Sequence, residues 1–81
     1  MPQAEVAVDY GARLRDLRSA LGIAQGALAA RMSMTQPNLC ESELGRRAMS
    51  EAEFLRGQAA LIELRDERNA AFAEARKAVT A

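Results

Sequence analysis

The chain has 81 residues, which is enough for one small domain. It contains no histidine and a single cysteine, so a zinc site and a disulfide scaffold are excluded, and the lone thiol fits a reducing cytosol. Acidic and basic residues balance to a formal net charge of zero, which argues against DNA binding to a small degree, because many DNA-binding domains are basic. We expect neither a signal peptide nor a membrane helix, because no apolar run approaches ~20 residues.

The first helix is predicted between Asp9 and Gly22. Asp9 is a good N-cap, and Gly22 is a good residue for the left-handed conformation that ends a helix. The residues before it, 1–8, show no periodic pattern and contain no Lys or Arg, so we expect a flexible N-terminal arm. The predicted buried stripe of the helix consists of Leu14, Leu17 and Leu21.

Residues 23–50 predict two short helices that are joined by a tight turn. Thr35 and Pro37 form a typical start for the second of these helices, and Gly45 is a typical stop. The predicted inward-facing residues of the two helices are Leu28, Ala29, Met32 and Leu39.

One pattern in this region carries a resemblance to a known family. It reads L-R-x-L-R-x-x-L-G-I-x-Q-x-x-L-A-x-R-M-x-M-T-Q at 14–36, and it continues with Leu39, Glu43, Gly45, Arg46 and Arg47. The pattern resembles the helix-turn-helix of lambda-repressor-like, Cro-type (Xre family) regulators. The resemblance implies that the second motif helix enters the major groove of DNA. It also implies a bacterial or phage-encoded protein of the cytosol that is associated with the nucleoid.

The resemblance implies roles for the polar residues that begin the two motif helices. Gln25 would contact a phosphate and brace Gln36, and Gln36 would read a base, since an amide can pair bidentately with adenine. Pro37 leaves two helix starts open, because the residue before a proline is disfavoured in the helical region and Gln36 could be the cap. The expected DNA-binding residues are Gln25, Thr35, Gln36, Pro37, Asn38, Glu41, Arg46 and Arg47.

Several of these roles have an open alternative. Asn38 is a base reader, a phosphate ligand or an ordinary surface residue at a helix start. Glu41 accepts a hydrogen bond from cytosine, or it repels phosphate and so discriminates against wrong sequences. Arg46 and Arg47 bind phosphates or cap helix carbonyls, and we favour phosphate. Ser42 stands where relatives have Ile or Leu, so we expect a less firmly seated helix.

The resemblance also implies a structural ion pair between Arg18 and Glu43, which would tie the first helix to the third. The planar guanidinium suits a bidentate bond to a carboxylate, so loss of Glu43 should destabilise the fold. From Arg13 to Arg47, six arginines stand against three acidic residues, which gives this half a net charge of +3. We expect DNA binding that is modest and sensitive to salt.

The last part of the chain, 50–81, departs from the family pattern and predicts one long helix. Ser50 and Glu53 form a capping box, and no strong stop follows. A helix of ~25 residues would be about 38 Å long. An alternative is a helix that folds back on its own domain or frays beyond Asp66.

This long helix carries two apolar stripes, and a monomer has too little surface to bury both. The stripe that we expect to cover the domain consists of Leu55, Ala59 and Ile62. The stripe that we expect to mediate homodimerisation consists of Phe54, Leu61, Leu64, Phe72 and Val79.

The sequence therefore predicts an all-α fold, a small helical bundle with a helix-turn-helix domain at 9–49 and a long C-terminal helix at 50–81. The leading functional hypothesis is a sequence-specific transcriptional regulator, in the simplest case a repressor, that binds a palindromic operator in double-stranded DNA as a homodimer. The alternative is a protein-binding module, such as an antitoxin, whose C-terminal helix grips a protein partner. An enzyme, a cofactor and a small-molecule ligand are not expected, because the sequence has no histidine and no nucleophile–base pair.

Overall fold

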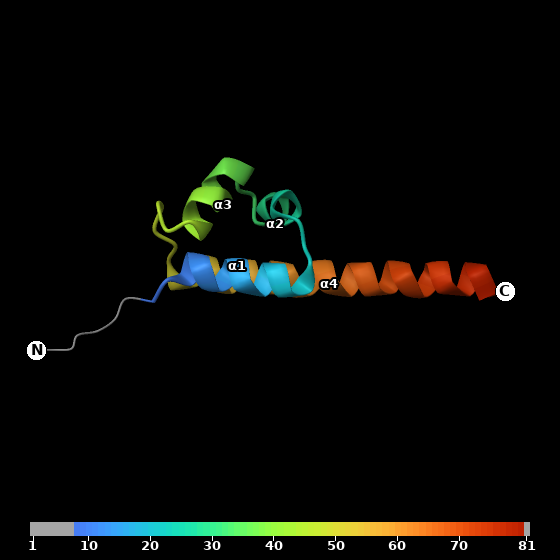
Figure 1. Ribbon diagram of the computed structural model, residues 1–81. Helices are drawn as coiled ribbons and strands as arrows, with labels where there is room; N and C mark the ends of the chain where they lie inside the picture. Colours follow the sequence, from blue (N-terminus) through green and yellow to red (C-terminus); the bar gives the residue numbers. More distant parts are fainter. Residues whose placement is uncertain (1–7, 81) are drawn as a thin grey trace, which may run out of the picture.

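The computed structural model describes residues 8–80, and all of its regular structure is helical. The predicted all-α fold is confirmed: the chain forms a small helical bundle whose last helix is by far the longest (Figure 1). The predicted arm at 1–8 lies outside the described residues except for Val8. The four helices are α1 (Tyr10–Leu21), α2 (Gln25–Arg31), α3 (Gln36–Glu43) and α4 (Glu51–Thr80).

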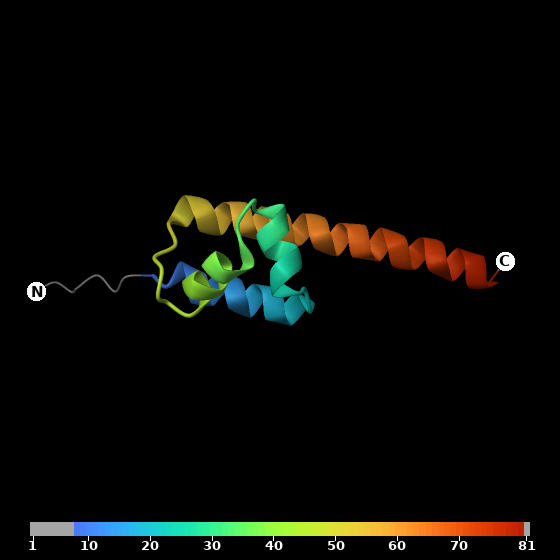
Figure 2. The ribbon, with the colours of Figure 1, turned by 90° about the horizontal axis from the view of Figure 1, so that it is seen from above.

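The helices form two layers. α1 and the first half of α4 lie side by side and run in the same direction, whereas α2 and α3 lie together across one face of this pair (Figures 1 and 2). The second half of α4 projects beyond the other helices (Figure 1). Within the described residues, each helix is too short or too polar to cross a lipid bilayer.

The ends of α1 and α4 follow the predicted capping chemistry. An oxygen of Asp9 accepts a hydrogen bond from the Ala12 N–H at 3.0 Å, and Gly22 ends α1 with φ +67°. At the start of α4, the Ser50 N–H donates to Glu53 at 3.0 Å, and the Glu53 N–H donates to the Ser50 hydroxyl at 3.1 Å. This reciprocal pair is the capping box that the sequence predicts.

The start of α3 decides between the two alternatives that Pro37 leaves open. Thr35 is the N-cap: its backbone is extended and its hydroxyl accepts a hydrogen bond from the Asn38 N–H at 3.2 Å. Gln36 is therefore the first residue of the helix and not its cap. Pro37 follows in the first turn, where a missing N–H removes no bond within the helix.

The core lies between the two layers and is built of leucine, isoleucine, alanine and methionine side chains. The predicted inward residues of the motif helices are buried, and Met49 joins them from the loop before α4. The buried hydrophobic residues are Leu14, Ile23, Leu28, Ala29, Met32, Leu39, Met49, Ala60 and Leu61.

The prediction that Leu17 is buried is wrong. Its side chain is 38% exposed, because α1 turns the face with Gly11, Leu14 and Arg18 toward the body. Leu17 lies about 100° around the helix from Arg18, at the margin of that face.

Two glycines allow the close approach of the helices. A Cβ added to Gly11 would lie 1.9 Å from the carbonyl oxygen of Ser42, so α1 contacts α3 backbone to backbone at this point. A Cβ added to Gly57 would lie 2.6 Å from a methyl group of Leu14, so Gly57 lets α4 pack tightly on α1. Any side chain at Gly11 would push α3 away from the body.

The assignment of the two α4 stripes is also wrong for its first half. Leu61 is 1% exposed and belongs to the core of its own chain, and the half-buried Phe54 and Leu64 pack against that core. These three residues share the side of the helix on which Gly57 admits α1. Leu55 and Ile62 are instead 52% and 44% exposed.

Candidate nucleic-acid interface

A buried ion pair lies at the centre of the bundle, as the resemblance implies. The Arg18 side chain donates from Nε and Nη2 to the two oxygens of Glu43, both at 2.8 Å, and from Nη1 to the Ile23 carbonyl at 2.9 Å. The Glu43 side chain is only 3% exposed. The bond to Glu43 raises the pKa of Arg18, and the pair ties α1 to α3.

This ion pair orients two glutamines that lead to the surface. Gln25, the first residue of α2, donates from Nε2 to Glu43 at 3.0 Å, so its Oε1 points away from the carboxylate. That oxygen accepts a hydrogen bond from Nε2 of Gln36 at 3.3 Å. The hydrogen bonds that connect Arg18, Glu43, Gln25 and Gln36 therefore orient the side chain of Gln36, the first residue of α3.

Gly26 provides the space for this arrangement. A Cβ at Gly26 would lie 3.2 Å from Oε1 of Gln36, which is tighter than an ordinary van der Waals contact. The sequence pattern marks Gly26 only as a residue of low helix propensity. Its neighbour across the turn gives it a second role, which is to leave room for the Gln36 amide.

The start of α3 is open to solvent. Thr35, Gln36, Pro37 and Asn38 are all exposed, and the Glu41 side chain is 44% exposed. α3 lies on the face of the bundle that is turned away from α4, and the projecting half of α4 runs away from it (Figure 1). The polar residues that the sequence singles out are thus gathered at one accessible helix end.

The two arginines after α3 differ in their surroundings. Arg46 is 69% exposed and lies 3.7 Å from a carboxylate oxygen of Glu41, which is a loose surface pair. Arg47 donates from Nη1 to the Ser42 hydroxyl at 2.9 Å and from Nη2 to Glu53 at 3.2 Å. We therefore assign Arg47 to the structure of the loop, in place of the phosphate contact expected from the sequence.

The same bonds explain how α3 is seated without an apolar residue at Ser42. Ser42 is 1% exposed; its hydroxyl accepts the bond from Arg47, and its carbonyl lies directly against Gly11. The expected loose seating of α3 is not found, because a small polar residue allows a closer contact here than Ile or Leu would.

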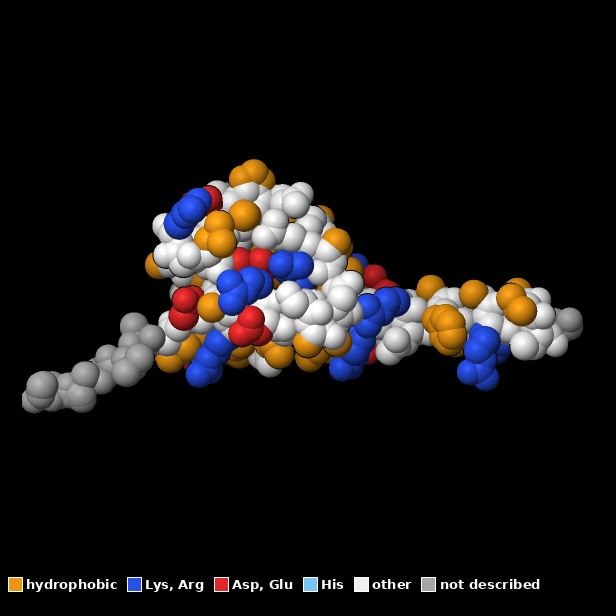
Figure 3. Space-filling view, in the orientation of Figure 1, with side chains coloured by type: hydrophobic (Ala, Val, Ile, Leu, Met, Phe, Trp, Pro, Cys, Tyr) orange, Lys and Arg blue, Asp and Glu red, His pale blue; other side chains and the backbone are white. Residues whose placement is uncertain are grey.

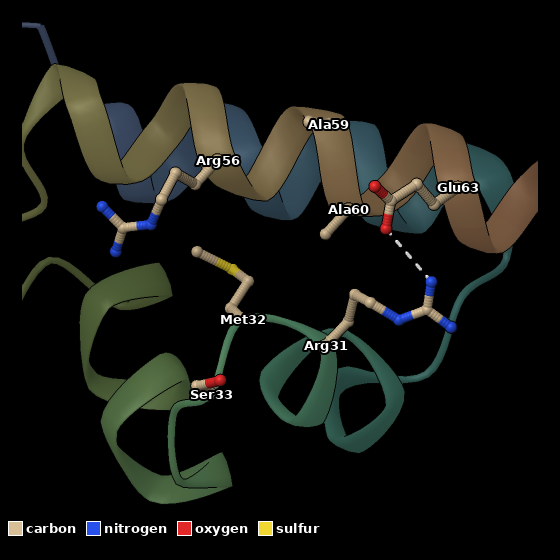
Figure 4. A pocket seen from close by; sticks show the side chains of 7 residues that line it. All are labelled: Arg31, Met32, Ser33, Arg56, Ala59, Ala60 and Glu63. Atoms are coloured by element: carbon tan, nitrogen blue, oxygen red, sulfur yellow. Dashed lines mark hydrogen bonds and ion pairs between the residues drawn. The ribbon is translucent and has the colours of Figure 1, made fainter.

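A third group of charges connects α2 to α4. Arg31 donates to both oxygens of Glu67 at 2.7 Å and to Glu63 at 3.1 Å, and these bonds raise the pKa of Arg31 and lower that of Glu67. Figure 4 shows Arg31 reaching across a shallow pocket toward Glu63 on α4. The pocket, about 340 Å³ in volume, is lined by Arg31, Met32, Ser33, Arg56, Ala59, Ala60 and Glu63.

Ion pairing uses most of the positive charge of the helix-turn-helix half. Three of its arginines have acidic partners within the same half, and Arg31 and Arg47 have partners on α4. Among the described residues, Arg13 is the arginine of this half that lies within 4 Å of no carboxylate. The surface around the start of α3 is consequently polar and close to neutral.

The two contacts of Arg31 with Glu63 and Glu67 could be recognised from the sequence, although they lie outside the motif pattern. Glu63 and Glu67 are four residues apart on one helix, which places both carboxylates on the same face for one cation. The bond from Arg47 to Glu53 has no comparable signal, because Glu53 already has a role in the capping box.

Comparison with protein-family models, with curated proteins and with solved structures found no match to this chain. The functional assignment therefore rests on the geometry of the residues described above.

Proposed function

We propose that this protein is a sequence-specific DNA-binding regulator that uses a Cro-type helix-turn-helix. The start of α3 enters the major groove, and Gln36 is its principal base reader. The observation that carries the proposal is the chain of bonds from Arg18 through Glu43 and Gln25 to Gln36. This chain of bonds holds the Gln36 amide at the exposed start of α3, where the edge of a base can reach it.

The chemistry of the exposed residues fits this role. The bond to Gln25 uses one N–H of Gln36, so its Oε1 and its second N–H remain to pair with the N6 and N7 positions of adenine. Asn38 offers the same donor and acceptor two residues later, and the ring of Pro37 can contact a thymine methyl group.

Phosphate contacts contribute less than in strongly basic domains. Arg46 pairs with Glu41 of α3, and because this loose pair contributes at most ~1 kcal/mol, it can be exchanged for a phosphate. Base reading by the amides therefore carries a large share of the affinity.

A domain of this size can regulate transcription by binding to DNA as a homodimer and excluding other proteins from the site. Two copies read two half-sites of a palindrome, spaced near one helical turn, and block access of the polymerase. Repression is the simplest outcome of such binding.

The test begins with selection of binding sites from random double-stranded DNA. We expect enrichment of a palindrome, and we expect Gln36→Ala to weaken binding to the selected duplex about 10- to 100-fold, the effect of one lost bidentate base contact. The matched control is Glu74→Ala, on the projecting half of α4, which should bind as the unchanged protein does. Failure to enrich any sequence, or equal binding by Gln36→Ala, contradicts the proposal.

A second candidate function is that of a protein-binding module, such as an antitoxin, that grips its partner with α4. The observation that favours it is the exposure of Phe72 and Val79, which are 65% and 83% exposed on the projecting half of the helix. Arg46→Ala distinguishes the two: it weakens binding of a selected duplex if the protein is a DNA-binding regulator and leaves a complex through α4 unchanged.

A further inference from the structure

The exposed side of α4 carries a heptad pattern. This pattern combines residues from both of the apolar stripes that the sequence predicts. Residues at intervals of seven and of three follow one seam that runs from the body of the bundle along the projecting half. One row of the seam is Leu55, Ile62, Asn69 and Arg76, and the other row is Gln58, Arg65, Phe72 and Val79. Most of these side chains are exposed, and Gln58 and Arg65 are half-buried.

The first half of the seam borders an apolar groove between α1 and α4. The groove has a volume of about 240 Å³, and its lining is Leu17, Ala20, Leu21, Gln58, Leu61, Ile62 and Arg65. Over the body of the bundle, hydrophobic side chains follow the edge that lies away from α3 (Figure 3). The exposed Leu17, which the sequence places in the core, is thus part of a surface continuous with the seam.

We propose that a second copy of this chain occupies this surface, with its α4 packed antiparallel to the first. In an antiparallel pair the two rows of the seam face one another. A two-fold axis at residue 67 then places Leu55 opposite Val79 of the second copy and Ile62 opposite Phe72 of the second copy. Each of these apolar layers occurs twice in the dimer.

Charge selects the antiparallel arrangement over the parallel one. A parallel pair would stack Arg65 on its own copy and Arg76 on its own copy, which brings like charges together in the seam. The antiparallel pair places Arg65 opposite Asn69 and Arg76 opposite Gln58, so each guanidinium meets an amide that can accept its hydrogen bond.

The groove explains why an aromatic residue lies on the projecting half. In this pair, Phe72 of the second copy comes to Ile62, at the groove that Leu17 and Leu21 border. The packing of the two α4 helices then covers both the apolar groove near the start of α4 and the apolar side chains on its projecting half.

The arrangement also deepens the proposed function, on which this step rests. The body of each copy contacts α4 from Glu51 to Arg68, which lies mostly on one side of the axis. The antiparallel pair therefore places the two bodies on opposite sides of the two-fold axis, as the two half-sites of a palindrome require.

The dimer is tested first by sedimentation, without DNA. The unchanged protein should have the mass of two chains at micromolar concentration, whereas Phe72→Ala should shift toward the mass of one chain. Phe72 is exposed in its own chain, so Phe72→Ala should keep its helical circular dichroism. The control Glu74→Ala, about 160° around the helix from Phe72, should remain dimeric. A single-chain mass for the unchanged protein overturns the proposal.

The orientation is tested by a spin label at Thr80→Cys in a Cys40→Ser background, since Cys40 is the one native thiol. The antiparallel pair separates the two labelled backbones by about 39 Å along the helices. A parallel pair brings them within about 10 Å, the distance between packed helices. The long distance supports the proposal, and the short one overturns it. Because neither measurement uses DNA, a dimer that binds no DNA would refute the proposed function and leave the antiparallel pair standing.

Discussion

Glu43 accepts three hydrogen bonds inside the bundle, two from Arg18 and one from Gln25. Through these bonds the buried carboxylate connects α3 to α1 and to α2. The contribution of such a pair is best seen when one partner is removed, because the other charge is left without compensation.

Replacing Glu43 by alanine should therefore lower the free energy of unfolding by about 3 kcal/mol, because Arg18 is left unpaired and is mostly shielded from water. Urea unfolding followed by circular dichroism measures the loss. Glu41→Ala is the matched control: its pair with Arg46 is loose and exposed, so we expect a change below ~1 kcal/mol. Equal losses in the two variants would contradict a special role for the buried pair.

Glu53 gives the fold a dependence on pH. The hydrogen bond from the Ser50 N–H, and then the bond from Arg47, lower the pKa of Glu53 below its ordinary value of 4.5. A carboxyl whose pKa is lower in the folded state stabilises the fold above pH 4.5, and the stabilisation is lost as pH falls through the folded-state pKa.

The unchanged protein and Glu53→Gln should differ in melting temperature at pH 5. This difference should shrink as the pH falls below 4.5 and through the folded-state pKa of Glu53. Glutamine retains the capping geometry but does not titrate, so the comparison isolates the charge of Glu53 from the other carboxylates. Thermal melts at a series of pH values measure it. A difference that stays constant with pH would show that the Glu53 charge does not stabilise the fold.

At the scale of the helix, much of the fold can be predicted because its signals are local. The caps at Asp9 and Ser50 depend on side chains that bond to backbone groups three residues away, so sequence spacing contains the necessary information. The start of α3 is less certain from sequence, since Thr35 and Gln36 are both suitable before Pro37. The Thr35 hydroxyl decides it by accepting the bond from the backbone of Asn38.

Which stripe of α4 faces the body could not be predicted, because both stripes are apolar. The decision is made by Gly57, which permits contact with Leu14, and a glycine carries no hydropathy signal of its own. The candidate site also has a part that the sequence predicts and a part that it does not. The family pattern indicates Arg18, Glu43 and the glutamines, but the partner of Arg47 lies beyond the motif and is brought near only by the tertiary structure.

The helical glycines allow a direct test of these packing arguments. Gly11→Ala should destabilise the fold by about 1–3 kcal/mol or more, since the new methyl group meets the Ser42 carbonyl and neither backbone can move freely. Gly26→Ala should destabilise the fold much less than Gly11→Ala does, because its Cβ meets only the end of the Gln36 side chain and alanine favours the helix. Thermal or urea unfolding gives both values, and an equal loss in the two variants would contradict this account of the packing.

At the scale of the whole molecule, the distribution of charge sets how the protein meets DNA. Arg31 and Arg47 are bound to acidic residues of α4, so a net charge counted along the helix-turn-helix half overstates what a duplex encounters. Few cations remain for phosphates, and salt should affect binding less than in a strongly basic domain.

The salt dependence of DNA binding measures how many phosphate contacts each chain makes. Replacing Arg46 by alanine should reduce the slope of log affinity against log salt by about 1 per chain, or about 2 for a dimer, as expected when one phosphate contact per chain is lost. Fluorescence anisotropy with a selected duplex at several salt concentrations measures the slope. An unchanged slope would remove Arg46 from the phosphate-binding residues.

The central claim, that the exposed start of α3 contacts bases, is tested most directly by nuclear magnetic resonance. A ¹⁵N-labelled sample is titrated with the selected duplex, and the amide signals of each residue are followed. The account predicts the largest shifts at the backbone amides of residues 35, 36 and 38–41 and at the side-chain amides of Gln25, Gln36 and Asn38. Shifts that are confined to α4, with these signals unmoved, would contradict it.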